Sequence, residues 1–180
     1  MSIEIIRLSP TTDICPFHCS DKDLNDFLLE DAKKYLSDLM AVTYLFVDAD
    51  SHKTIAYFSL LNDKVAYNPM DKTIWNRINR LVSNRKRRKS YPSVKIGRLA
   101  VSEDCVQSGI GTTILNYIKN KVIIVPLAGC RFLTVDAYAN VTDFYQKNGF
   151  NFFTSTDLLE PTRLMYFDLK PFKEQIDNTK

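Results

Sequence analysis

The sequence contains no apolar run long enough to cross a membrane, no internal repeat and no low-complexity linker. A membrane-spanning helix needs about 20 predominantly apolar residues, and no stretch approaches that length. The segment from Met1 to Arg7 carries an acid near its start and no long apolar run, so it predicts a first strand and not a signal peptide. We therefore expect a cytoplasmic protein without a membrane partner.

An excess of charge of one sign is also missing, because 24 Lys and Arg residues nearly balance 21 Asp and Glu residues. The formal net charge of +3 is too small to indicate nucleic-acid binding by itself. Hydrophobic residues make up 45% and charged residues 25% of the 180 positions, which is typical of a globular chain and excludes wholesale disorder. We predict a single domain over residues 1–180, with its core at about 3–169 and a short polar C-terminal tail.

Cysteine and histidine are scarce, with four and two residues. Cys15 and Cys19 lie close together around His18, whereas Cys105 and Cys130 are too far apart in the chain to supply a second pair. Structural zinc sites usually take two closely spaced pairs of ligands. We therefore predict no metal, and free thiols in a reducing compartment.

Hydrophobic patterning predicts an α/β (α+β) fold with helices packed on a mixed sheet. Early strands in hairpins and a strand–helix–strand unit in the middle of the chain make the sheet mixed. The strands are expected over residues 3–8, 40–47, 54–65, 94–101, 131–137, 150–153 and 164–169. The helices are expected over 21–38, from 71 onward, from the glycines at 109 and 111 to about 122, and over 141–148.

Local signals mark several element ends. Ser20 is expected to cap the first helix, with Asp23 in the place of the glutamate of a capping box. The tripeptide Ser90-Tyr91-Pro92 predicts a loop before the next strand, and Gly149 predicts a left-handed helix end.

The most informative stretch is the turn Gln107-Ser108-Gly109-Ile110-Gly111-Thr112, which joins a strand to a helix. Glycine lets the backbone approach a ligand closely and adopt positive φ. The first N–H groups of a helix lack intrahelical partners, and with the helix dipole they form an anion site suited to a pyrophosphate. Alone, the Gly-x-Gly pattern also fits a plain strand-to-helix turn.

Two other phosphate-binding motifs do not fit this turn. A P-loop requires Gly-Lys-Ser/Thr after its spacer, and that sequence is absent. The dinucleotide fingerprint requires a third glycine, and Ile114 follows the turn instead. Asp136 ends the next strand, but it lies further from the glycines than that motif expects.

Several separate pieces of the chain, taken together, carry a family resemblance. The pieces are Cys19 to Leu28, Gly97-Arg98-Leu99-Ala100-Val101, the turn Gly109-Ile110-Gly111-Thr112, Val135-Asp136-Ala137 with Asn140, and Asp143-Phe144-Tyr145-Gln146-Lys147-Asn148-Gly149-Phe150. In this order they resemble the GNAT superfamily of N-acetyltransferases over roughly residues 17–168. The first piece resembles the subgroup that includes the acetyltransferase toxins of bacterial toxin–antitoxin pairs.

The resemblance implies transfer of the acetyl group from acetyl-CoA to a primary amine by direct attack in a ternary complex. It also implies a mostly antiparallel central sheet in which one strand splays from its neighbour and offers backbone groups to the pantetheine. Val106 stands where the family usually has Gln or Arg, so the turn is expected to bind mainly through its N–H groups. The implied cofactor contacts are Leu99, Ala100, Val101, Val106, Gln107, Ser108, Gly109, Ile110, Gly111, Thr112, Asn140 and Tyr145.

The catalytic residue that the resemblance implies is Tyr145, as proton donor to the departing thiolate. The alternative is that Tyr145 is a core aromatic beside its aromatic neighbours, and for Asn140 the alternative to a cofactor contact is a helix N-cap. No general base stands out. Asp63, Glu103 and Asp136 are candidates by residue type only, and Glu103 is expected on a solvated loop.

A basic segment lies before the cofactor strand, with Arg77, Arg80 and the run from Arg85 to Lys89. It predicts either a solvated loop or a surface for a polyanionic substrate such as tRNA. The acceptor is therefore left open as a small molecule, a protein or an aminoacyl-tRNA, and a non-catalytic acyl-CoA-binding or interaction module is a further alternative. A homodimer through Trp75 and the aromatics near 150–153, and an antitoxin partner, are also possible on this sequence.

Overall fold

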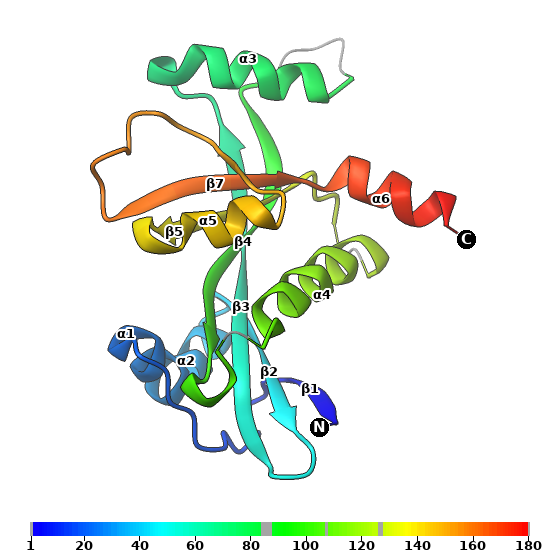
Figure 1. The fold of residues 1–180 in the computed structure, drawn as a ribbon. Helices are drawn as coiled ribbons and strands as arrows, with labels where there is room; N and C mark the ends of the chain where they lie inside the picture. The colour runs from blue at the N-terminus through cyan, green and yellow to red at the C-terminus, as the bar shows by residue number, and fades with distance from the viewer. Residues whose placement is uncertain (1, 84–87, 107, 126–127, 180) are drawn as a thin grey trace. The chain divides into compact units, whose positions relative to one another are not determined.

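A computed structural model of the chain describes residues 2–83, 88–106, 108–125 and 128–179 (Figure 1). The strands are β1 (Ile3–Arg7), β2 (Val42–Asp48), β3 (Lys53–Ala66), β4 (Ser90–Val101), β5 (Phe132–Tyr138), β6 (Asn151–Phe152) and β7 (Thr162–Asp168). The α-helices are α1 (Lys22–Asp26), α2 (Ala32–Ser37), α3 (Lys72–Leu81), α4 (Ile110–Ile124), α5 (Thr142–Lys147) and α6 (Leu169–Asn178). No helix within the described ranges is both long and apolar enough to span a membrane.

The strands form one seven-stranded sheet in the order β1-β2-β3-β4-β5-β7-β6. The ladders β1–β2, β2–β3, β5–β7 and β6–β7 are antiparallel. This sheet with its helices confirms the predicted mixed α/β class, while the splayed strand pair stays a prediction. The chain divides into two compact units, residues 1–61 with 96–117 and residues 62–95 with 118–180, each with a core of its own. A single domain over residues 1–180 likewise stays a prediction.

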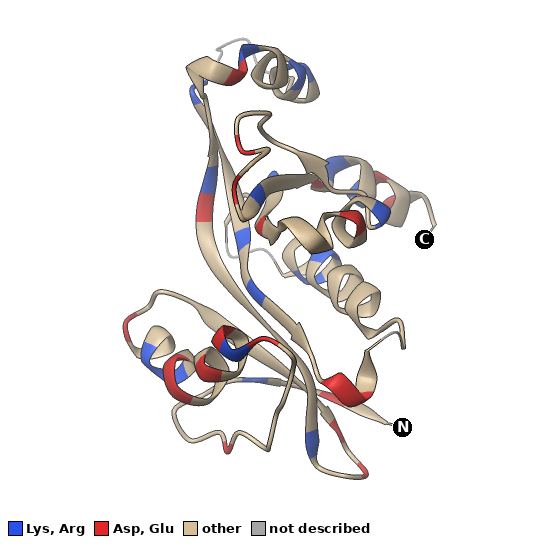
Figure 2. Cartoon of the chain, turned by 60° about the vertical axis from the view of Figure 1, so that its left-hand side comes forward, with Lys and Arg blue, Asp and Glu red and all other residues tan. Residues whose placement is uncertain are grey.

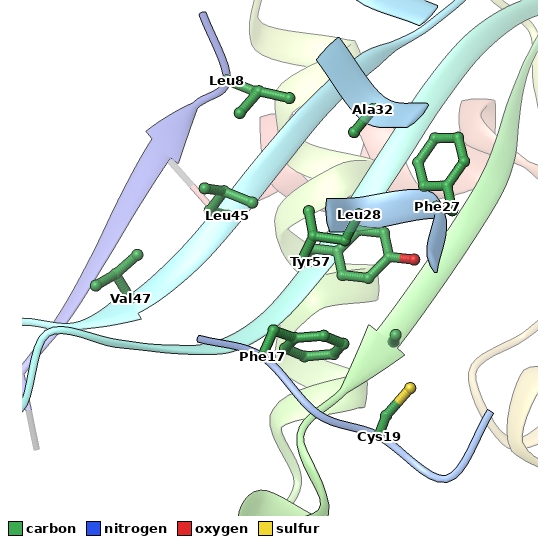
Figure 3. Packing of buried hydrophobic residues seen from close by; sticks show 10 residues of the cluster. Leu8, Phe17, Cys19, Phe27, Leu28, Ala32, Leu45, Val47 and Tyr57 are labelled. Atoms are coloured by element: carbon green, nitrogen blue, oxygen red, sulfur yellow. The ribbon is translucent and has the colours of Figure 1, made fainter. Parts of the chain in front are cut away.

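The core of the first unit lies between the strands and the α1–α2 segment (Figure 3). Tyr57 is fully buried there, and its hydroxyl donates a 2.7 Å hydrogen bond to the Leu24 carbonyl. On the other sheet face, Phe46 of β2 lies 5.7 Å from the Tyr117 ring of α4, which packs the first half of that helix on the sheet. The core residues are Leu8, Phe17, Cys19, Phe27, Leu28, Ala32, Leu45, Val47, Tyr57 and Ala100.

The core of the second unit forms where α3 packs on the sheet. Trp75 stacks on Tyr91 at 5.6 Å between ring centroids, and it is only 6% exposed. Phe150 and Phe153 are buried as well. These three side chains are therefore not exposed contact residues, and the homodimer suggested for them stays a prediction. The core residues are Val65, Trp75, Ile78, Tyr91, Phe132, Phe153 and Tyr166.

The first helix differs from its predicted form at its start and in its middle. Asp21, and not Ser20, is the N-cap: its carboxylate accepts from the N–H groups of Asp23 at 2.8 Å and Leu24 at 3.3 Å. Two cap-forming residues stand side by side, and the sequence alone does not choose between them. A π-helical turn from Phe27 to Asp31 separates α1 from α2. It escaped prediction because the apolar spacing still brings the core side chains to one face.

Two further expectations were wrong or incomplete. Ser90 to Pro92 belong to β4 and not to a loop, because Tyr91 is buried against α3. The Pro92 carbonyl accepts a 3.0 Å hydrogen bond from the Arg131 N–H, so the proline fits in the strand. The polar tail forms α6, whose first N–H groups include that of Lys170, bonded to the Asp168 carboxylate at 3.0 Å.

Candidate functional site

The predicted anion-binding turn lies in the first unit, between the end of β4 and the start of α4. Gly109 has a φ of +81°, in the left-handed region that favours glycine. A Cβ atom added there would meet nothing within 4 Å, so the backbone angle, and not crowding, requires the glycine. The open space beside Gly109 also fits a group that approaches the backbone closely.

The start of α4 directs N–H groups out of the helix. The first intrahelical bond runs from the Thr113 N–H to the Gly109 carbonyl at 3.1 Å. The N–H groups of Ile110 and Gly111 therefore precede the helical ladder, at the positive end of the helix dipole. The Ile110 side chain is only 8% exposed, which anchors this helix end in the first unit. The arrangement has the geometry that the sequence predicts for an anion site, and anion binding itself stays a prediction.

The loop before this turn is braced by hydrogen bonds. The Ser102 N–H donates to the Ile55 carbonyl at 2.8 Å, and the Glu103 N–H donates to the His18 carbonyl at 3.1 Å. The Ser108 hydroxyl donates to the Cys105 carbonyl at 2.5 Å, so its proton is already engaged within the loop.

The remaining predicted cofactor contacts of the first unit lie along β4 and the same loop. Ala100 is buried in the first core. Leu99 and Val101 are half-buried, and their side chains lie on the opposite face of β4 because successive side chains of a strand alternate. Val106 is 58% exposed, so no core packing occupies its side chain. Gln107 lies outside the described residues, and its contact stays a prediction. Thr112 is exposed in the first turn of α4.

Tyr145 belongs to α5, in the second unit. It is 6% exposed, with the rings of Phe144 and Phe150 at 5.1 Å and 5.4 Å, so it does pack as a core aromatic. Burial raises the pKa of Tyr145, which keeps the phenol protonated at neutral pH. No hydrogen bond of its hydroxyl to another described residue occurs in the structure. The side chain therefore combines a packed ring with a proton that is not engaged elsewhere.

Asn140 lies in the short 3-10 helix Ala139–Val141 and is exposed. It is not the N-cap of α5, because Val141 occupies that position and the Thr142 hydroxyl bonds the Ala139 carbonyl at 3.1 Å. The capping interpretation is therefore wrong, and the cofactor contact stays a prediction.

The acids considered as bases have different surroundings. Glu103 is exposed on the 3-10 turn after β4, 3.6 Å from His18, and this acidic turn is coloured red in Figure 2. Asp136 forms an ion pair with Lys95. Asp63 accepts a 2.7 Å hydrogen bond from the Thr134 hydroxyl. The last two arrangements join separate strands, and no sequence signal marked Lys95 or Thr134.

Basic residues lie on and after α3, and the blue segments of that helix mark them in Figure 2. Arg77, Arg80, Arg88 and Lys89 are all exposed, whereas residues 85–87 of the basic run lie outside the described residues. Arg77 also donates a 3.4 Å hydrogen bond to the Phe152 carbonyl. The described part of the segment is thus a solvated basic surface.

Solved structures resemble the fold over almost the whole chain. A bacterial toxin has a TM-score of 0.82 at 14% identity, over 98% of this chain and 96% of its own. AtaTR bound with acetyl-CoA has a TM-score of 0.75 at 21% identity, over 97% and 98%. AtaT complexed with acetyl-methionyl-tRNAfMet has a TM-score of 0.77 at 21% identity, over 97% and 99%. No family model and no curated protein matches the sequence.

These likenesses bear on the fold, and they agree with the architecture that the sequence motifs imply. The TM-scores of 0.82 and 0.75 over nearly the full length of this chain show that its strands and helices are arranged as in those structures. The chain has the GNAT-like fold that its motifs predict, and it shares that fold with AtaT and with a bacterial toxin.

Proposed function

We propose that this chain is an N-acetyltransferase that moves the acetyl group of acetyl-CoA to a primary amine. The observation that carries the proposal is the turn at Gly109, which precedes the N–H groups of Ile110 and Gly111 at the start of α4. The fold is shared with AtaTR, which has been solved with acetyl-CoA bound. A pyrophosphate is the anion that such a helix start holds well. The N–H groups of Ile110 and Gly111 would hold it, together with the rest of the turn from Val106 to Thr112.

The strand before the turn supplies the second part of the cofactor contact. Leu99, Ala100 and Val101 would offer backbone groups to the pantetheine amides. A backbone N–H of this strand would also stabilise the negative charge that develops on the carbonyl oxygen. Asn140 would add a side-chain contact.

The chemistry requires a neutral amine, an activated carbonyl and a proton for the leaving group. The amine nitrogen forms a bond to the acetyl carbon, the carbon–sulfur bond breaks, and the nitrogen gives up one proton. Tyr145 donates its phenolic proton to the departing sulfur and is reprotonated by the proton that leaves the nitrogen. Burial keeps the phenol of Tyr145 protonated at neutral pH, so its proton is in place before the reaction.

Substitution Tyr145→Phe tests the proposal, with Tyr166→Phe as the matched control. Both side chains are buried tyrosines of the second unit, at 6% and 3% exposure. We expect Tyr145→Phe to lower kcat by about 10²- to 10⁴-fold, with the Kd for acetyl-CoA changed little. Tyr166→Phe should leave both constants near their wild-type values. An assay of CoA thiol release over time measures kcat, and calorimetric titration measures the Kd for acetyl-CoA.

The results also separate the alternatives. Wild-type chain that binds acetyl-CoA but transfers acetyl to no amine would support the non-catalytic module. A Tyr145→Phe variant with wild-type kcat would remove Tyr145 from the mechanism. Turnover with polyamines or peptides but not with charged tRNA would support a transferase for small or protein amines.

A second, narrower proposal is that the acceptor is the α-amine of an aminoacyl-tRNA. It is favoured by the exposed basic residues Arg80, Arg88 and Lys89 and by the fold shared with AtaT, which has been solved with acetyl-methionyl-tRNAfMet. An α-amino group has a pKa of about 7.7–8.0, against about 10.4 for lysine. A larger share of it is therefore neutral at pH 7, which lessens the need for a strong base.

The narrower proposal is tested with labelled acetyl-CoA and bulk aminoacyl-tRNA. We expect acetyl transfer that weakens with salt, because phosphate contacts release counterions. Arg80→Gln with Arg88→Gln should flatten that salt dependence, whereas Lys22→Gln, an exposed change in the first unit, should not. No transfer, together with normal growth on expression, would refute an aminoacyl-tRNA acceptor. An antitoxin partner and a homodimer are compatible with either proposal.

A further inference from the structure

The second half of α4 carries a buried lysine, Lys119, which is only 4% exposed. Its ammonium nitrogen lies 4.3 Å from the ring centroid of Phe167, 5.7 Å from that of Phe172 and 6.0 Å from that of Phe150. Burial lowers the pKa of Lys119, because desolvation disfavours the charged form. No carboxylate of a described residue pairs with it. An apolar side chain would suit this aromatic surrounding better, so the amino group needs another explanation.

The ammonium of Lys119 binds the end of α5, the helix that carries Tyr145. Lys119 Nζ donates a 2.8 Å hydrogen bond to the carbonyl of Asn148, which is the C-cap of α5. The last carbonyls of a helix lack intrahelical donors, and the helix dipole is negative at this end. Lys119 therefore supplies from α4 both the donor and the positive charge that the end of α5 favours.

Two neighbours of Lys119 are also direct neighbours of Tyr145. The N–H groups of Asn148 and Phe150 donate to the Tyr145 carbonyl at 3.1 Å and 3.0 Å. The Phe150 ring packs edge-on against the Tyr145 ring at 5.4 Å between centroids. Lys119 thus contacts one residue that holds the Tyr145 backbone and another that holds both its backbone and its ring.

The helix α5 depends on such contacts because it is short. It has six residues, and its N-cap, Val141, makes no side-chain capping bond. A helix of this length is not stable alone, so packing sets its position. A Cβ atom added to Gly149, just after the helix, would lie 3.0 Å from the Phe167 ring, so the chain passes close against β7. The contact with Lys119 fixes the same end of α5 from the side of α4.

We propose that Lys119 is a positioning residue that holds α5, and through it the Tyr145 phenol, in place for proton transfer to the departing sulfur. This inference rests on the proposed acetyltransferase function and adds a residue to its machinery. Lys119 is buried and bonded to Asn148, so it acts through Tyr145 and not on the acetyl group. A purely structural lysine would instead affect stability and would affect activity independently of Tyr145.

Substitution Lys119→Met removes the charge and the donor but keeps a long, unbranched side chain that packs well against aromatic rings. We expect kcat to fall about 10- to 100-fold, because a displacement of a catalytic group by about 1 Å has an effect of this size. The Kd for acetyl-CoA should change little, since the turn proposed to hold it keeps all of its residues. Ile118→Val is the matched control: this fully buried neighbour in α4 should lower thermal stability and leave kcat at its wild-type value.

A double-mutant cycle with Tyr145→Phe shows whether Lys119 acts through the phenol. In the Tyr145→Phe background, Lys119→Met should change kcat by less than about 2-fold, because no phenolic proton remains to be positioned. The rates are measured as CoA thiol release with the polyamine, peptide or charged tRNA on which the wild type is most active. Thermal unfolding confirms that each variant is folded. If Lys119→Met does not fold, the same cycle is run with Lys119→Gln, which is uncharged, one bond shorter and should lower kcat in the same way.

The outcomes separate this inference from the proposed function. Wild-type kcat in Lys119→Met would overturn the inference alone, and so would an equal loss of kcat with and without the Tyr145 hydroxyl. A loss of kcat in Ile118→Val as large as that in Lys119→Met would show that activity simply follows stability, and it would overturn the inference as well. In each of these cases the transfer of acetyl groups by the wild type still stands. No turnover by the wild type with any amine would overturn the proposed function itself.

Discussion

Substitution of Gly109 tests the geometry on which the cofactor site depends. Its φ of +81° lies where side chains with a Cβ are disfavoured, and the space around an added Cβ is open to 4 Å. Gly109→Ala therefore changes one quantity, the cost of the backbone angle, and introduces no clash. That cost is about 1–2 kcal/mol for a residue in the left-handed region.

The cost of the backbone angle in Gly109→Ala appears as a lower free energy of unfolding, as weaker binding of acetyl-CoA, or as a share of each. If the turn keeps its shape, the free energy of unfolding falls by about 1–2 kcal/mol and the Kd for acetyl-CoA is unchanged. If the turn relaxes, the N–H groups of Ile110 and Gly111 turn away, and the Kd rises by at most about 5- to 30-fold. The two losses together should not exceed the cost of the angle. Asparagine tolerates this region better, so Gly109→Asn should lose less than Gly109→Ala.

Urea unfolding and calorimetric titration with acetyl-CoA measure the two parts. Gly129→Ala is the matched control, because an added Cβ at Gly129 also meets nothing within 4 Å and its φ is not in the left-handed region. It should change neither quantity. Gly109→Ala that is as stable as the wild type and binds as well would refute the argument. So would equal losses in Gly109→Ala and Gly129→Ala.

Two further predictions concern the cores. Hydrogen bonds, first that of Thr154 and then those of Ser155, hold the pKa of Asp71 below its usual value, so its stabilising effect is present above about pH 4 and is lost as the pH falls below that. Asp71→Asn should therefore cost about 1–3 kcal/mol at pH 7 in urea unfolding and progressively less as the pH falls below about 4, and a pH-independent difference would contradict this. Tyr57→Phe removes the 2.7 Å bond to the Leu24 carbonyl, which keeps the Phe27 N–H as a donor, so the free energy of unfolding should fall by about 0.5–1.5 kcal/mol, the net value of one hydrogen bond. A variant as stable as the wild type would show that the Tyr57 hydroxyl contributes nothing net to stability.

Much of the fold was predictable because its signals are local. The hairpin strands, the amphipathic helices and the glycine turn before α4 each depend on the spacing of neighbouring residues. Gly149, predicted as a left-handed helix end, has a φ of +85°. Errors occurred where two local signals compete, as at Ser20 and Asp21, or where tertiary burial overrides a turn signal, as at Tyr91.

The sequence by itself determined the class of the sheet and the glycine turn before α4, and it identified Tyr145 as the residue to test. Only the tertiary structure decided how two of the candidate bases are engaged: Asp136 pairs with Lys95, and Asp63 accepts from the Thr134 hydroxyl. Asp63 and Thr134 are 71 residues apart and meet across β4, which lies between their strands. Such a contact has no period and no spacing of its own. It exists because two strands that are distant in the chain bring their side chains to one face of the sheet, and no local pattern records that pairing.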